Sequence, residues 1–370
     1  MRRLGISIYP EEGNKKDIIH YIDLASKYGF ERIFTCLISI NGDKKAFVHG
    51  LTDLFQYAKS KGMQVIADVS PSVFADFHIK YDELKFFKDL GLYGIRLDLG
   101  FSGNEESMMT FNKEGLKIEI NMSNGSRYLE NILSYEPNRE NLIGCHNFYP
   151  HRYTGLSRAH FMRTSKQFKD MGIPTAAFVS SNVGTIGPWP VSEGLCSLEE
   201  HRSLPMEVQA KDLFNTNLVD DVIIANCFAS EEELSAMSEL NKDILSLRVE
   251  LEENTPELEK RIINEELHFN RGDVSEYMIR STQSRVKFKE HTFHLFNPMP
   301  IKKGDVLIES SLYERYAGEL QIALKPMENS GRTNVVGRIK NEEIFLIDQI
   351  KPWQKFMLKA EKSNIREQVL

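Results

Sequence analysis

Three carboxylic acids lie at the ends of apolar runs in the first third of the chain, where their types and spacing suit acid–base chemistry. Asp68 ends the run V-I-A-D, Asp98 ends I-R-L-D, and Glu119 lies within I-E-I. In most glycosidases a pair of carboxyl groups flanks the scissile bond, one as general acid and the other as base or nucleophile. We therefore predict such a catalytic pair here, with Asp98 and Glu119 as its members and Asp68 in reserve.

The alternation of side chains along these runs predicts which of them share a face. Successive side chains of a strand point to opposite faces, so Arg96 and Asp98 are expected on the inner face, as are Glu119 and Asn121. Neighbouring strands lie about 4.8 Å apart, which would put Asp98 and Glu119 near the roughly 5 Å separation of retaining glycosidases. Asp68 and Glu119 would be about 10 Å apart, nearer to the inverting range.

Most of these residues also have a structural interpretation. Arg96 and Asp98 could neutralise each other as an ion pair. Asp68 stands before Ser-Pro, as a turn residue does, and His146 could be a hydrogen-bonded core histidine. Glu119 is flanked by isoleucines, and because a buried carboxylate needs a partner, this position favours a functional site.

A second set of polar residues lies at the ends of later apolar runs and is predicted to contact the substrate. The segment 146–152 is dense in polar and aromatic groups, and the loop 180–187 is rich in small residues. Barrel phosphate sites are commonly built from backbone amides of such late loops, and a guanidinium group suits phosphate or carboxylate. The residues predicted to contact substrate are Arg96, Asn121, His146, Asn147, Tyr149, Arg152, Ser180, Asn182 and Gly184.

The elements that must position these residues alternate regularly over the first 240 residues or so. Apolar runs of strand length begin near residues 4, 32, 64, 93, 117, 142, 175 and 221, with helix-periodic segments between them. Eight such units predict an α/β fold, a (β/α)8 TIM barrel, with its active site at the carboxyl ends of the strands. An open doubly wound sheet is the alternative, but the first strand–helix turn lacks a G-x-G-x-x-G motif. Ser197 and Ser230 are expected to open late helices with capping boxes.

The pattern changes after about residue 245, where one helical stretch at 255–267 is followed by strand signals only. The expected strands include 285–289, 305–308, 319–324 and 344–348, with turns at 303–305 and 329–331. We therefore expect two domains, a TIM-barrel catalytic domain over residues 1–243 and a small all-β barrel domain over residues 244–370.

The composition of the 370-residue chain limits its partners and its compartment. A net charge of −7 argues against nucleic acid or an anionic membrane surface as a partner. The N-terminus has no secretory pattern, and no apolar stretch approaches the roughly 18 residues of a membrane span. Four scattered cysteines without C-x-x-C spacing fit a reducing compartment, so a cytoplasmic location is expected.

Several of these segments together resemble one enzyme family, the MupG-type 6-phospho-N-acetylmuramidases of glycoside hydrolase family 170. They are LGISIYP (4–10), IADVSP (66–71), IRLDLG (95–100), IEINMSN (118–124) and HNFYP (146–150), and YAGELQIAL (316–324) and IDQIKPW (347–353) resemble its tail domain. The resemblance implies a TIM barrel followed by a cyclophilin-like β domain. It also implies cytoplasmic hydrolysis of a phosphorylated amino-sugar disaccharide, MurNAc-6-phosphate–GlcNAc, in peptidoglycan recycling. No cofactor and no metal ion are expected.

Other interpretations stay open at this stage. Asp68, Glu119 and His146 are ligand types for Mn2+ or Zn2+, so a metal-dependent sugar-phosphate isomerase or aldolase is the rival enzyme. A carbohydrate sensor with the second domain as its output module is the non-enzymatic alternative. In the glycosidase interpretation, the substrate's own 2-acetamido group could act as the nucleophile. The sequence leaves open whether the chain forms a homo-oligomer.

Overall fold

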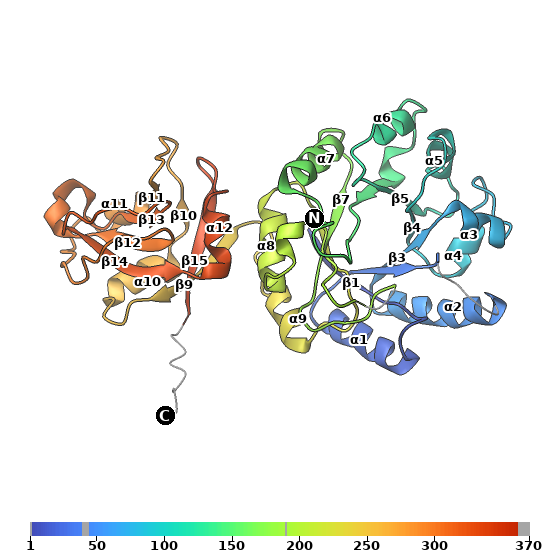
Figure 1. Ribbon diagram of the computed structural model, residues 1–370, viewed down its shortest axis with the longest axis horizontal. Helices are drawn as coiled ribbons and strands as arrows, with labels where there is room; N and C mark the ends of the chain where they lie inside the picture. Colours follow the sequence, from blue (N-terminus) through green and yellow to red (C-terminus); the bar gives the residue numbers. More distant parts are fainter. Residues whose placement is uncertain (1, 39–43, 189–190, 362–370) are drawn as a thin grey trace. The chain divides into compact units, whose positions relative to one another are not determined.

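The computed structural model describes residues 2–38, 44–188 and 191–361, and the chain divides into two compact units, Met1–Leu240 and Asn241–Leu370. The sequence predicts a boundary after residue 243. This position lies between Leu240, where the first unit ends, and Leu245, where the first strand of the second unit begins. Figure 1 shows a barrel ringed by helices, coloured blue to yellow, and a second sheet in orange and red.

The first unit is a closed barrel of eight parallel strands in chain order. Its strands are β1 (Arg3–Ser7), β2 (Arg32–Cys36), β3 (Gln64–Val69), β4 (Gly94–Leu97), β5 (Lys117–Asn121), β6 (Leu142–Cys145), β7 (Thr175–Val179) and β8 (Asp221–Ile224). Because β1 pairs in parallel with both β2 and β8, the sheet has no edge. The predicted (β/α)8 barrel is confirmed, and the open sheet is excluded.

Helices follow the strands and cover the outside of the barrel (Figure 1). They are α1 (Lys15–Lys27), α2 (Lys44–Ser60), α3 (Pro71–Asp76), α4 (Lys85–Asp89), α5 (Asn104–Met109), α6 (Tyr128–Leu133), α7 (Arg158–Asp170), α8 (Met206–Asn215) and α9 (Glu231–Ser238). The expected capping box at Ser230 is present, with Glu233 as its partner. The one expected at Ser197 is wrong, because the Ser197 hydroxyl bonds to the backbone of Asn147 and Phe178 instead.

The second unit is built on a seven-stranded, mostly antiparallel sheet in the order β10-β15-β9-β14-β12-β13-β11. Its strands are β9 (Leu245–Leu251), β10 (His268–Phe269), β11 (Met278–Ser281), β12 (Asp305–Glu309), β13 (Leu320–Ala323), β14 (Thr333–Ile339) and β15 (Lys355–Glu361). Its helices are α10 (Glu257–Glu265), α11 (Gln283–Lys287) and α12 (Ile344–Ile347). The helix expected at 255–267 is therefore confirmed, whereas the strands expected at 285–289 and 344–348 are wrong.

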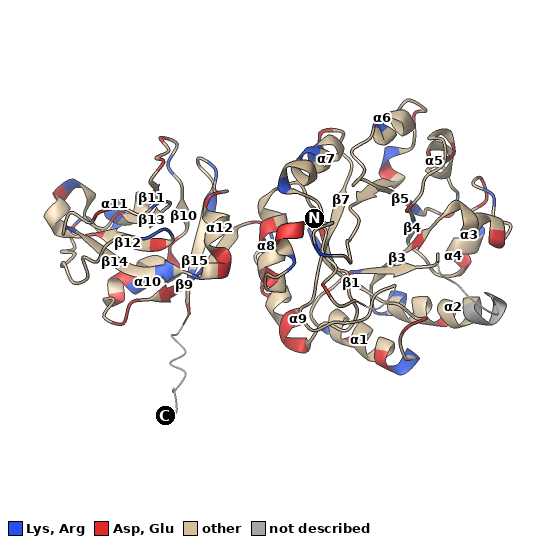
Figure 2. Cartoon of the chain, viewed as in Figure 1, with Lys and Arg blue, Asp and Glu red and all other residues tan. Residues whose placement is uncertain are grey.

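Charged side chains of both signs lie on the helices of both units, as Figure 2 shows. Across the described parts of the chain, no helix combines the length and the apolar character that crossing a bilayer requires.

Candidate active site at the carboxyl ends of the barrel strands

The register of the sheet places Arg96 between two of the predicted catalytic carboxylates. Asp68 of β3 pairs with Arg96 of β4, and Arg96 pairs in turn with Glu119 of β5. Asp98 follows the end of β4, so its expected place beside Glu119 is taken by Arg96. The Nη1 atom of Arg96 donates to Asp68 Oδ1 at 2.7 Å and to Asp98 Oδ1 at 3.4 Å, so these two oxygens lie no more than 6.1 Å apart.

Asp68 and Asp98 line a cavity of about 390 Å³, which we call the carboxylate pocket. Its lining residues are Cys36, Ile38, Asp68, Arg96, Asp98, Asn147, Phe148, Tyr149, Pro150, Phe178 and Pro188. The rings of Phe148 and Phe178 meet edge to face with centroids 5.0 Å apart, which adds an apolar wall. Of the predicted site residues, the pocket therefore brings together Asp68, Arg96, Asp98, Asn147 and Tyr149.

Asp68 has the electrostatic setting of a general acid. Burial raises the pKa of this carboxyl from 3.8 to about 7, against the lowering effect of Arg96 and with a further rise from Asp98. Only 7% of Asp68 is exposed, whereas the Asp98 side chain is 37% exposed. A carboxyl group with a pKa near 7 holds its proton in a large fraction of molecules at neutral pH and can donate it to a leaving group.

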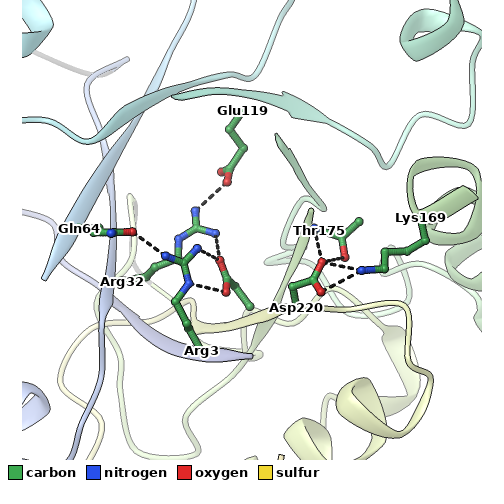
Figure 3. Close-up of polar contacts among 8 residues, drawn as sticks. Arg3, Arg32, Gln64, Glu119, Lys169, Thr175 and Asp220 are labelled. Carbon is green, nitrogen blue, oxygen red and sulfur yellow. Dashed lines mark hydrogen bonds and ion pairs between the residues drawn. The ribbon is translucent and has the colours of Figure 1, made fainter. Parts of the chain in front are cut away.

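Glu119 belongs to a different network of polar side chains, in the interior of the barrel. It is 0% exposed, and its Oε2 accepts from Arg32 Nη2 at 2.7 Å. Arg32 also binds Asp221 at 2.7 Å, and Asp221 takes two bonds from Arg3, at 2.9 and 2.6 Å. Figure 3 shows Glu119 pointing towards Arg32, with Arg3 and Gln64 beside Arg32.

This network joins the amino-terminal ends of several strands, opposite the usual catalytic end. Arg3, Arg32, Gln64 and Asp221 are each the first residue of their strand, in β1, β2, β3 and β8. Glu119 lines neither the carboxylate pocket nor the second cavity described below. Its placement therefore favours a structural role over a catalytic one.

Ser123, which the sequence interpretation did not single out, connects three of the predicted substrate-contacting residues. Its hydroxyl accepts from the backbone N–H of Asn147 at 2.8 Å and lies 3.2 Å from His146 Nδ1. Its own N–H donates to Asn121 Oδ1 at 2.9 Å. Ser123 lies two residues after Asn121 and four after Glu119, so the same alternation that selected those two residues could have identified it.

His146 and Asn147 act on the site through these contacts. His146 is fully buried, and its Nε2 lies 2.8 Å from the Ser165 hydroxyl. Burial lowers its pKa from 6.5 to about 3, so the ring stays neutral over the physiological range. Asn147 accepts a short hydrogen bond from Arg96 Nη2 through its side-chain oxygen. The Ser123 contact thus holds the backbone of Asn147, whose side-chain oxygen binds Arg96.

A second cavity, of about 780 Å³, lies at the loops that follow β6 and β7, and we call it the hydroxyl pocket. Its lining residues are Arg152, Tyr153, Ser180, Ser181, Asn182, Gly184, Thr185, Val191, Ser192, Glu193, Gly194, Glu199, Glu200, Arg202 and Ser203. It contains four of the residues predicted to contact substrate: Arg152, Ser180, Asn182 and Gly184.

The first backbone N–H groups of the 180–187 loop already donate hydrogen bonds to side chains of the same protein. Ser180 N donates to Gln209, Ser181 N to Asn226, and Asn182 N to Glu233, at 2.8 to 2.9 Å. The next two amides donate to the Ser181 hydroxyl at 3.2 and 2.9 Å. Because these donors are engaged, the phosphate contacts expected from them would require the loop to rearrange.

The ligand set of the rival metal-enzyme interpretation is not assembled. Asp68 binds Arg96, Glu119 binds Arg32, and both ring nitrogens of His146 face serine hydroxyls. Within residues 2–38, 44–188 and 191–361, no group of three or more His, Cys, Asp or Glu side chains is placed to hold a metal ion.

Comparison with known proteins connects this site to one family. The N-terminal model of the 6-phospho-N-acetylmuramidases matches residues 4–239, and their C-terminal model matches residues 245–359. A search of curated proteins found no match.

Two solved structures are similar over nearly the whole chain. A crystal structure of an uncharacterized protein from B. cereus shares 48% sequence identity, with 97% of this chain and 99% of that one covered and a TM-score of 0.91. A conserved protein of unknown function from Enterococcus faecalis shares 26% identity, with 97% and 96% covered and a TM-score of 0.72. Both family models and the barrel geometry agree, and the chain belongs to the 6-phospho-N-acetylmuramidase family of glycosidases.

Proposed function

We propose that this chain hydrolyses MurNAc-6-phosphate–GlcNAc in the cytoplasm during peptidoglycan recycling, with Asp68 as general acid and Asp98 as its partner carboxylate. The observation that carries the proposal is the Arg96 guanidinium, which holds both carboxyl groups at one wall of the carboxylate pocket. Family membership supports the phosphorylated muramic acid sugar as substrate.

The reaction proceeds in two steps with balanced proton transfer. Asp68 gives its proton to the glycosidic oxygen, the bond from that oxygen to the anomeric carbon breaks, and Asp98 supplies an electron pair to the same carbon. A water then attacks this carbon, Asp68 takes a proton from the water, and the bond to Asp98 breaks. Arg96 stabilises the Asp68 carboxylate that exists between the two steps. If the 2-acetamido oxygen attacks instead, Asp98 orients the acetamido group.

The reaction is expected to retain the anomeric configuration. Retaining glycosidases hold their carboxyl groups about 5–5.5 Å apart and inverting ones about 6.5–9.5 Å apart, and here the nearest oxygens are within 6.1 Å. Proton NMR during the first minutes of hydrolysis should show MurNAc-6-phosphate appearing first in the anomeric form that the substrate had.

The same NMR experiment tests whether the phosphorylated disaccharide is the substrate and whether the enzyme depends on a metal ion. The unphosphorylated disaccharide should remain uncleaved, and EDTA should leave the rate on the phosphorylated one unchanged. If the phosphorylated disaccharide yields no GlcNAc, the proposal fails on its substrate. If the first product has the opposite configuration, the Asp68–Asp98 pair cannot be acting as described. If EDTA abolishes turnover, the metal-dependent interpretation is favoured.

The pH dependence of kcat/KM should report the raised pKa of Asp68. The protonated carboxyl is the active form, so activity is full below about pH 7 and is lost as the pH rises through that value. Above it, kcat/KM for the disaccharide should fall about tenfold per pH unit. Initial rates from pH 5 to 9 measure this limb, and a rate that stays level up to pH 9 would exclude Asp68 as the acid.

A further inference from the structure

The hydroxyl pocket lies next to the carboxylate pocket, and the proposed mechanism does not use it. Tyr149 lines the carboxylate pocket, and its backbone carbonyl accepts from Arg202 Nη1 at 3.0 Å. Arg202 in turn lines the hydroxyl pocket. The two cavities are therefore neighbours, separated by the hydrogen bond between Tyr149 and Arg202.

The cations of the hydroxyl pocket already have partners. Arg202 binds Glu199 through Nε at 2.7 Å and Nη2 at 2.6 Å, and its Nη1 donates to main-chain carbonyls. Glu200 is paired with Arg158 at 2.5 Å. Arg152 is more exposed, with its Nε 4.0 Å from a Glu193 oxygen. Each of the three carboxylates in this lining therefore faces a guanidinium group, and the paired charges leave no net positive charge to attract a phosphate dianion.

Besides Arg152, the groups that remain available in this pocket are neutral. Asn182 and Thr185 are exposed, and within the described residues neither the Asn182 amide nor the Thr185 hydroxyl has a side-chain hydrogen bond. Ser192 and Ser203 add hydroxyl groups to the same lining. Amide and hydroxyl groups that both donate and accept suit the hydroxyl and acetamido groups of an uncharged sugar.

We propose that the hydroxyl pocket binds the uncharged leaving sugar, GlcNAc, while the phosphorylated sugar lies on the side of the carboxylate pocket away from it. This assignment rests on the proposed function, because it takes the disaccharide as the substrate. It makes Asn182 and Thr185 specificity residues for the leaving group.

Two substrates that differ only in the leaving group test the assignment. One is MurNAc-6-phosphate–GlcNAc, and the other is 4-nitrophenyl 6-phospho-N-acetylmuramide, which carries no second sugar. The quantity measured is the ratio of kcat/KM for the disaccharide to kcat/KM for the aryl glycoside. In Asn182→Ala and in Thr185→Val this ratio should fall about tenfold, the usual loss when one hydrogen bond to substrate is removed. The matched control Asn104→Ala, at the exposed start of α5, should keep the wild-type ratio.

An unchanged ratio in both variants overturns the assignment, whether both rates fall together or neither falls. Equal falls would mean that the pocket holds the phosphorylated sugar. Failure of the wild-type protein to cleave either substrate would instead overturn the proposed function, so the two failures are distinguishable.

Discussion

Asp68→Asn is expected to lower kcat on MurNAc-6-phosphate–GlcNAc by about a thousandfold, within the range of about 10² to 10⁴ that a general acid contributes. An amide cannot donate the proton that the departing GlcNAc oxygen needs. The effect should depend on the leaving group. A 2,4-dinitrophenolate leaves without protonation, so on 2,4-dinitrophenyl 6-phospho-N-acetylmuramide the same variant should lose less than about tenfold in kcat/KM, which reports the first step alone. The kcat/KM values of both substrates measure the difference, because the second step, in which Asp68 is the base, does not enter them.

Asp98→Asn is the matched variant for this experiment. Its carboxylate acts at the anomeric carbon rather than on the leaving group, so the variant should lose activity on both substrates alike. If Asp68→Asn loses equally on both substrates, its role is not proton donation. If Asp98→Asn recovers on the activated substrate and Asp68→Asn does not, the two assignments must be exchanged.

Glu119→Gln is expected to unfold the barrel at a lower temperature. Glu119 is 0% exposed and bound to Arg32 at 2.7 Å, and the loss of one partner of a buried ion pair usually costs about 3–5 kcal/mol. For a unit of this size a loss of about 3 kcal/mol lowers Tm by roughly 6–12 °C. Differential scanning calorimetry of the variant against the wild type measures the shift.

An exposed ion pair is the control for this stability experiment. Asp170 pairs with Lys166 at 2.6 Å one turn apart on α7, and both side chains are exposed. Exposed pairs of this kind contribute little to stability, so Asp170→Asn should leave Tm nearly unchanged. A Tm for Glu119→Gln equal to that of the control would show that the Arg32–Glu119 pair does not stabilise the barrel.

The barrel and the place of the candidate site could be predicted from the sequence, because period and composition carry that information. Eight apolar runs at even spacing are sufficient for a closed parallel sheet, and reactive groups collect at the carboxyl ends of its strands. Asp68, Arg96 and Asp98 were found in this way. The pairing of Asp98 with Glu119 could not be judged, because alternation shows which face a residue shares but not its register with the next strand.

The sequence misjudged three elements, at 344–348, at 285–289 and at Ser197. The run 344–348 is short and apolar, which suits a buried strand and a buried helix equally, and α12 forms there. At 285–289 an alternating apolar pattern lies over α11. Ser197 has the spacing of a helix cap, yet its hydroxyl is taken by Asn147 and Phe178. At Ser197, therefore, tertiary contacts outweighed a local preference.

The most direct test of the account compares kcat on MurNAc-6-phosphate–GlcNAc for Asp68→Asn and Glu119→Gln, side by side and well below the Tm of each variant. We expect Asp68→Asn to lose about a thousandfold, whereas folded Glu119→Gln should stay within about tenfold of the wild type, because Glu119 lines neither cavity. The reverse result, a folded but inactive Glu119→Gln beside an active Asp68→Asn, would contradict the assignment of the catalytic acid and restore Glu119 to the chemistry.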